Sequence, residues 1–292
     1  KIYDFTLTKA NSTTFAKAVD ITTFADDATE HTGTITFAAG GTIQNDVTFN
    51  TNNIVSFTGT MNIGTASSRK NLTHTAGNTA INGTLNAATT QLGNLTLTGD
   101  TTITTSGTQT YNGTINDATA GAHTLILNSG TSQITFASSV GQTAAPKVLT
   151  VNGPVAINGA AVTTTDEQNY NAAITSTGAI TLKSAALNLN CSTVTTAGAQ
   201  TYDGPVNLLS DTSLTLNTGD LLLKSPLAGA HKFTIAKTND AAFAGSVSVT
   251  HFEITLANDT QFANPVVVTN FAITSANDTH FAETLTVDSF SI

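Results

Sequence analysis

Four residues near the N-terminus form the densest group of side chains able to do acid–base or metal chemistry. Asp26, Asp27, Glu30 and His31 fall within six positions, just after Phe24. Two carboxylates that face one groove are what glycoside hydrolysis needs, and histidine with carboxylates can hold a metal ion. The same residues suit a solvated loop that interrupts the repeat described below. We favour the solvated loop. A role in recognition is the second reading, and a catalytic or metal pocket is the third.

A second group consists of three carboxylates spaced 19 residues apart, Asp240, Asp259 and Asp278. If each occupies the same position on successive coils, the three stack about 4.8 Å apart. Carboxylates at that distance repel one another unless they splay, accept hydrogen bonds or hold a cation, and hard oxygen ligands suit Ca²⁺. A weak calcium site is therefore one reading of this column, and no other cofactor is expected.

The alternative reading of the column is structural. An asparagine precedes each of these aspartates, and both residue types favour sharp turns, because their side chains hydrogen-bond to the nearby backbone. Stacked amides also form ladders of the cross-β kind. We favour turns joined by a ladder over a calcium site. The expected ladder residues are Asn239, Asp240, Asn258, Asp259, Asn277 and Asp278.

The remaining reactive residue types give no site. No two of the six histidines stand at metal-ligand spacing, and His123 and His231 occupy matching positions in two Ala-Gly-Ala-His segments. Cys191 is the single cysteine, so it forms no internal disulfide, and we expect it to be buried and inert. No nucleophile elbow or phosphate-binding loop is present. We expect no catalytic residues and no enzymatic activity.

The elements that position these residues come from a 19-residue repeat. Residues 233–251, 252–270 and 271–289 are three ungapped copies, and residues 5–24 carry the same pattern at the other end. Two phenylalanine columns recur in these copies, and we expect both to stack inside the fold rather than form an exposed binding stripe. They are Phe233, Phe252 and Phe271, and Phe243, Phe262 and Phe281.

Apolar residues alternate within each copy, in short runs bounded by Asn, Asp and Gly, which is typical of half-buried strands. A 19-residue unit is too short for a propeller blade. The sequence therefore predicts an all-β fold, a single-stranded β-helix (β-solenoid) of about 19 residues per coil in the regular parts. We expect it to be right-handed, because left-handed solenoids typically use periods of six residues. At one strand spacing per coil, about 15 coils would extend roughly 70 Å.

Between the regular copies the same residue types recur, but the spacing between equivalent residues is no longer constant. A phrase of Val or Ile, two threonines, three further residues and then Gln-x-Tyr occurs around Tyr111, Tyr170 and Tyr202. No linker interrupts the chain, so we expect residues 1–292 to form one continuous solenoid. Both termini cut through a repeat without a polar cap, and we expect a fragment that is uncapped at both ends.

The composition excludes several classes of function. Only 10% of residues are charged, the net charge is −9 and Arg69 is the sole arginine, so a nucleic-acid-binding face is not expected. No apolar run is long enough to cross a membrane. Sixty threonines favour strands with a soluble outer surface. An ice-binding face is not expected, because Thr-x-Thr does not recur at a fixed position of the repeat.

The repeat, the Gln-x-Tyr phrase and runs such as residues 149–154 together resemble filamentous haemagglutinin-type repeats of large bacterial surface proteins. Such proteins are two-partner-secretion exoproteins or autotransporter passengers. The resemblance covers nearly the whole chain and implies a right-handed β-helix shaft, outside the bacterial cell at its surface, that commonly serves adhesion. It carries over no site residues, because these repeats share no catalytic group.

From residues and resemblance together we expect a non-catalytic structural or adhesive shaft segment. It would mediate adhesion or present a distal binding domain, with a host or neighbouring-cell glycan or protein as partner. A self-assembling extracellular fibre or surface-layer component is the alternative, in which the partner is a second copy. A polysaccharide-degrading enzyme built on a β-helix comes third.

Overall fold

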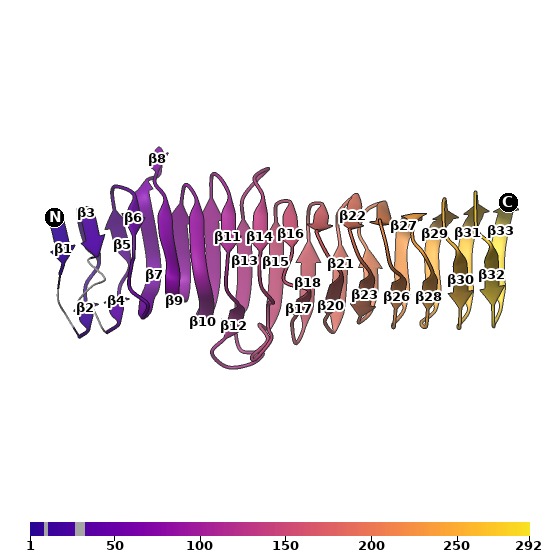
Figure 1. Cartoon of the computed structure of the whole chain (residues 1–292), viewed down its shortest axis with the longest axis horizontal. Helices are drawn as coiled ribbons and strands as arrows, with labels where there is room; N and C mark the ends of the chain where they lie inside the picture. Colours follow the sequence, from indigo (N-terminus) through magenta and orange to yellow (C-terminus); the bar gives the residue numbers. More distant parts are fainter. Residues whose placement is uncertain (9–10, 27–32) are drawn as a thin grey trace. The chain divides into compact units, whose positions relative to one another are not determined.

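The computed structural model describes residues 1–8, 11–26 and 33–292, and this part of the chain is all β, without a helix. Its strands pair in parallel with strands of the coils before and after, as the side-by-side arrows in Figure 1 show. The fold is a β-solenoid of about 14 turns whose equivalent positions lie about 20 residues apart. The predicted fold class is confirmed.

The chain divides into two compact units, Lys1–Gly153 and Pro154–Ile292, which we call the N-terminal unit and the C-terminal unit. Each is a stack of coils with its own interior. The following description takes them one at a time.

The strands of the N-terminal unit vary in length. Short strands end at tight corners, and long strands continue through a bend without losing their pairing to the neighbouring coils. They are β1 (Ile2–Leu7), β2 (Thr13–Phe15), β3 (Val19–Asp26), β4 (Ile35–Phe37), β5 (Gly41–Ile43), β6 (Val47–Thr48), β7 (Ile54–Thr65), β8 (Ser68–Arg69), β9 (Leu72–Ala87), β10 (Thr90–Thr105), β11 (Gln109–Tyr111), β12 (Ile115–Asp117), β13 (Thr124–Asn128), β14 (Ile134–Phe136) and β15 (Val148–Asn152).

The C-terminal unit has three strand segments per coil. Its strands are β16 (Val155–Ile157), β17 (Ala161–Thr163), β18 (Glu167–Tyr170), β19 (Ile174–Ser176), β20 (Ile180–Lys183), β21 (Ala186–Leu189), β22 (Thr193–Thr196), β23 (Gln200–Asp203), β24 (Val206–Leu208), β25 (Thr212–Leu216), β26 (Leu221–Leu223), β27 (Leu227–Lys237), β28 (Ala241–Phe243), β29 (Val247–Ile254), β30 (Asp259–Phe262), β31 (Val266–Ile273), β32 (Asp278–Phe281) and β33 (Leu285–Ser291).

In the C-terminal unit every third strand stacks in register as far as β26, and every second strand does so from there on. One face consists of the parallel series β17, β20, β23, β26, β28, β30 and β32. The other two faces merge at a bend in the last coils, where β27, β29, β31 and β33 each serve both. In this unit paired residues are 19 to 22 apart, as in Val155 with Ile174 and Thr215 with Lys237.

The N-terminal unit has a less regular step. Asn78 of β9 pairs with Asn94, 16 residues on, whereas Gln109 pairs with Ile134, 25 residues on. Extra residues leave the coil at its corners; the connection after β12 is the clearest example in Figure 1. Strand pairing resumes beyond each corner, so the side-chain alternation is kept.

The core of each unit is filled by the inward residues of every strand, which are aliphatic or aromatic and almost wholly buried. In the C-terminal unit Phe233, Phe252 and Phe271 form one column of rings, with centroids 5.4 and 5.1 Å apart. The second column, Phe243, Phe262 and Phe281, has spacings of 4.8 and 4.9 Å. Both columns run inside the coil, and each ring also meets the other column edge-on.

Candidate functional site

The acidic group expected near the N-terminus is described only in part. Asp27, Glu30 and His31 lie outside the described residues, whereas Asp26 is the last residue of β3 and only 5% of its surface is exposed. Its Oδ2 accepts hydrogen bonds from the backbone N–H groups of Asn50 and Thr51, at 3.1 and 3.0 Å. Asp26 thus points into the fold and ties its coil to the next one.

The next coil carries a buried histidine that sequence reasoning did not single out. His74 of β9 is 1% exposed, and its ring packs edge-on against Phe49 with centroids 6.0 Å apart. Nε2 lies 3.2 Å from the carbonyl oxygen of Thr51, and Nδ1 lies 2.9 Å from Oγ1 of Thr79. Burial lowers the pKa of the ring, although the Thr51 hydrogen bond and the Asp26 charge oppose that shift.

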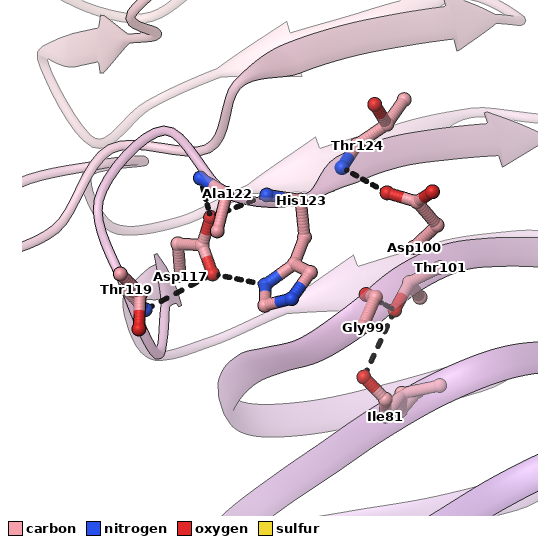
Figure 2. Close-up of polar contacts among 9 residues, drawn as sticks. All are labelled: Ile81, Gly99, Asp100, Thr101, Asp117, Thr119, Ala122, His123 and Thr124. Carbon is pink, nitrogen blue, oxygen red and sulfur yellow. Dashed lines mark hydrogen bonds and ion pairs between the residues drawn. The ribbon is translucent and has the colours of Figure 1, made fainter.

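The corner after β12 is organised by one carboxylate, shown in Figure 2. The Asp117 side chain is fully buried and accepts from the backbone N–H groups of Thr119, Ala122 and His123, at 3.2, 3.1 and 2.8 Å. It also accepts from Nδ1 of His123 at 2.6 Å. Since a carboxylate only accepts, Nδ1 carries the hydrogen, and Nε2 faces outward on a ring that is 26% exposed.

A second loop lies against this corner. The backbone N–H of Gly121 donates to the carbonyl of Ala145, and Lys147 donates to that of His123, both at 2.8 Å. Oδ1 of Asn116 accepts from Thr143 at 3.1 Å. The two loops, residues 117–123 and 140–147, are therefore a single ordered protrusion, which we call the paired-loop corner.

The matching Ala-Gly-Ala-His segment in the C-terminal unit shares part of this arrangement. Nδ1 of His231 lies 3.5 Å from Oδ1 of Asp211, but that carboxylate is exposed. The backbone N–H of Lys232 donates to it at 2.9 Å, as Thr124 donates to Asp100 in the first copy. That backbone hydrogen bond is the main reason why the pKa of Asp211 is lowered. The two segments thus share a backbone hydrogen bond to an aspartate of the preceding coil.

The Gln-x-Tyr phrase is a buried corner that recurs three times. In the first copy Tyr111 donates its hydroxyl to Oε1 of Gln109 at 2.8 Å. Nε2 of Gln109 donates to the carbonyl of Ile103, to Oγ1 of Thr105 and to the carbonyl of Asn128. The glutamine thereby closes the corner between two strands and reaches the next coil.

The other copies repeat these contacts on different faces. Tyr202 donates to Gln200 at 2.8 Å and Tyr170 to Gln168 at 3.0 Å. Burial raises the pKa of all three tyrosine hydroxyls, and it raises the pKa of the Cys191 thiol to about 12. Cys191 is a free, buried thiol. These groups are therefore protonated interior donors at neutral pH.

The Asn-Asp column of the C-terminal unit forms side-chain bonds along the stack. Nδ2 of Asn239 donates to Oδ1 of Asp220 at 2.7 Å, and Nδ2 of Asn258 donates to Oδ1 of Asp240 at 2.9 Å. One coil further on, Asn277 donates to the side chain of Asn258. Two of these links join an amide to a carboxylate and one joins two amides.

Carboxylates of this column also border a shallow hollow of about 300 Å³. Asp220, Asp240 and Asp259 line it together with Leu222 and Gln261. Asp278 belongs to the same column, paired with Asp259 through the backbone. In the part of the chain that the structure describes, no three His, Cys, Asp or Glu side chains are grouped so that they could hold a metal ion.

Sequence reasoning identified the repeat and its columns but missed the buried polar centres at Asp117 and His74. One signal was available for the first: Asp117 begins the connection that leads to the Ala-Gly-Ala-His segment. No comparable signal marks His74. Its neighbours on the adjacent coils are the apolar residues Leu92, in register, and Phe49, by ring contact, so no polar partner in the sequence points to it.

What these side chains do chemically is to hold one coil to the next. The buried side chains of Asp26, Asp117 and Gln109 each bind backbone or side-chain groups of a corner or of a neighbouring coil. Among the described residues no helix is long and apolar enough to span a membrane. No family model matches the chain, and no curated protein or solved structure gives a significant match.

Proposed function

We propose that the chain is a non-catalytic shaft segment of a bacterial cell-surface protein, of the kind built from filamentous haemagglutinin-type repeats. Its role is to present a distal binding domain or to contact a partner itself, on a host or neighbouring cell. The secretion route of such a shaft is two-partner secretion or autotransport.

The observation that carries this proposal is the unbroken coil-to-coil pairing within each unit. Backbone hydrogen bonds, stacked rings such as Phe252 on Phe271, and side-chain links such as Gln200 to the carbonyl of Thr215 all connect neighbouring coils. Each coil contacts only its neighbours, so every added coil extends the stack and adds one more stabilising interface, as in other solenoids. A spacer needs this property and needs no reactive group.

One surface feature favours contact with a partner over a passive spacer. The paired-loop corner adds surface residues to its coils, and Asp117 holds the first of its two loops in one conformation. Gln142, Thr143 and Lys147 are exposed on it. Ordered loops lose less entropy on binding than mobile ones, and recognition commonly lies on loops that a rigid scaffold positions.

The test is negative-stain electron microscopy of the purified chain beside an array of cell-surface glycans and matrix proteins. Single rods that capture one reproducible ligand support an adhesive shaft, and Gln142→Ala with Lys147→Ala should then weaken capture at least severalfold. Lys224→Ala, an exposed lysine in the C-terminal unit, is the matched control. Single rods that capture nothing support the presenting shaft.

Two outcomes contradict the proposal. Long filaments in place of single rods favour the self-assembling fibre. Depolymerisation of a polysaccharide on the array, detected as released reducing ends, favours the enzyme.

A further inference from the structure

The interior of the N-terminal unit contains one ionisable ring in an otherwise apolar column. His74 pairs in register with Leu92, and Leu92 pairs with Tyr111, while Phe49 covers the other side of the ring. A Cβ atom placed on Gly77 would lie 2.7 Å from Nε2, so the backbone closes over the ring. The ring is thus enclosed by protein.

A neutral ring can make both hydrogen bonds of His74. The carbonyl of Thr51 can only accept, so Nε2 carries the hydrogen. Nδ1 then accepts from the hydroxyl of Thr79 in the neutral state. Both partners are satisfied without a positive charge.

Few charged groups surround the ring to stabilise its protonated form. Strands β6 and β7, on the coil before, carry no titratable side chain, and the one such residue of β10 is Asp100, eight positions beyond Leu92. Asp26 is the charged group that acts on the ring. Its Oδ2 is bound by the N–H groups of Asn50 and Thr51, and its buried Oδ1 makes no hydrogen bond to the ring, so Asp26 acts on His74 only as a nearby charge.

We propose that His74 is an acid-sensitive switch, whose protonation loosens the coils around Thr51 and Thr79 while the C-terminal unit stays closed. The proton must enter a site enclosed by Phe49, Leu92 and the backbone at Gly77. Water can solvate the positive charge of the protonated ring only when the coils around it separate. Acidification thus softens one stretch of the solenoid and leaves the rest rigid.

The direction follows from linkage. Burial lowers the pKa of His74 below the 6.5 of an unperturbed histidine, so the opened state binds the proton more tightly. Stability is complete above pH 6.5 and is lost as pH falls from there toward the lowered pKa. Across that window the ratio of closed to open coils falls by up to about tenfold per pH unit. The Asp26 charge reduces this slope without reversing it.

Hydrogen exchange by mass spectrometry at pH 7.5, 6.5 and 5.5, expressed as protection relative to intrinsic exchange rates, tests the proposal. Protection in peptides covering residues 47–81 should fall severalfold or more between pH 6.5 and 5.5. Peptides covering residues 206–249 of the same sample should keep theirs. Equal loss in both regions, or no loss in residues 47–81, overturns the switch with the wild-type chain alone.

Two variants locate the effect. His74→Gln keeps a donor and an acceptor but does not titrate, so protection in residues 47–81 should become independent of pH. His280→Gln removes an exposed histidine of β32 and should leave the wild-type pH response unchanged. A pH response that survives His74→Gln assigns the effect to another group.

Discussion

The two units are built from the same kind of coil but differ in how strictly the coil is repeated. In the C-terminal unit paired residues are 19 to 22 apart, and identical residues fall on top of one another, as in Phe252 on Phe271. In the N-terminal unit the step ranges from 16 to 25. Rings stack there as well, as in Phe37 on Phe57, so a variable step keeps the interior columns and places its extra residues at corners that differ from coil to coil.

The polar centres follow this difference. Asp26, His74 and Asp117 are buried and all lie in the N-terminal unit. In the C-terminal unit, exposed links that recur from coil to coil, such as Asn258 to Asp240, join the turns. Interior packing is shared by both units, so the comparison predicts that ring deletions are costly in both, and that mutations of aspartates at corners are costly mainly in the N-terminal unit.

The largest effect is expected from removing a stacked ring. Phe252→Ala should cost about 3–5 kcal/mol of unfolding free energy, because a buried ring is replaced by a cavity. Phe57→Ala, an equally buried ring of the N-terminal unit, should cost about 1 kcal/mol less. Phe252 meets four other rings and Phe57 meets two. Equilibrium urea unfolding, followed by circular dichroism, measures both.

The control for this pair is Val267→Ala, because Val267 is 49% exposed and its truncation leaves no cavity. Hydrogen exchange on peptides from each unit then shows where stability is lost. If the two phenylalanine variants prove equally costly, the two additional ring neighbours of Phe252 add nothing beyond burial.

A smaller effect is expected at the two Ala-Gly-Ala-His corners. Asp117→Ala removes the acceptor of four hydrogen bonds from the paired-loop corner and should cost about 2–3 kcal/mol. Asp211→Ala removes an exposed carboxylate and should cost clearly less. Thermal unfolding of the two variants and the wild type, at pH 7, gives the difference.

The same pair can be separated by pH. The pKa of Asp211 is lowered, chiefly by the Lys232 N–H, so its small contribution is present above the ordinary aspartate range and is lost as pH falls through the lowered pKa. Asp117→Asn keeps the shape of the side chain but replaces one oxygen with a donor, and should lie between wild type and Asp117→Ala. An Asp211→Ala cost equal to that of Asp117→Ala would remove the distinction between the two corners.

How much of this was predictable depends on the period. Phe233, Phe252 and Phe271 are 19 apart, and a fixed spacing with alternating apolar residues determines both the coil and its interior. The sequence therefore predicts the all-β solenoid and the position of the ring columns. The Asn-Asp column is predictable as a turn, but the carboxylate Asp220, which accepts from Asn239, breaks the 19-residue spacing and is not.

The N-terminal polar centres could not be derived in the same way. Which coil lies next to Asp26 depends on the length of each connection, and its partners Asn50 and Thr51 are 24 and 25 residues on rather than 19. His74 is hidden for the same reason, since its place in the column is fixed only once the step to Phe49 is known. When the step is constant, the spacing in the sequence shows which residues are in contact on neighbouring coils; when the step varies, it does not.

The smallest effect is expected from the Gln-x-Tyr corners, and it tests whether the two units differ everywhere or only where the step varies. Tyr111→Phe and Tyr202→Phe each leave the ring in place and leave one glutamine oxygen without its donor. Each should cost about 1–2 kcal/mol, because a buried acceptor loses its hydrogen-bond donor. Urea unfolding of both variants measures the costs.

Equal costs are the informative result. Tyr111 lies in the N-terminal unit and Tyr202 in the C-terminal unit, yet both hydroxyl bonds are 2.8 Å long and both tyrosines are almost wholly buried. If the costs agree, a corner with the same residues behaves the same way whatever the step around it, and irregularity is confined to the connections. If Tyr111→Phe is clearly milder, the variable coils relax around a lost hydrogen bond as the constant ones cannot, and the difference between the units extends into their interiors.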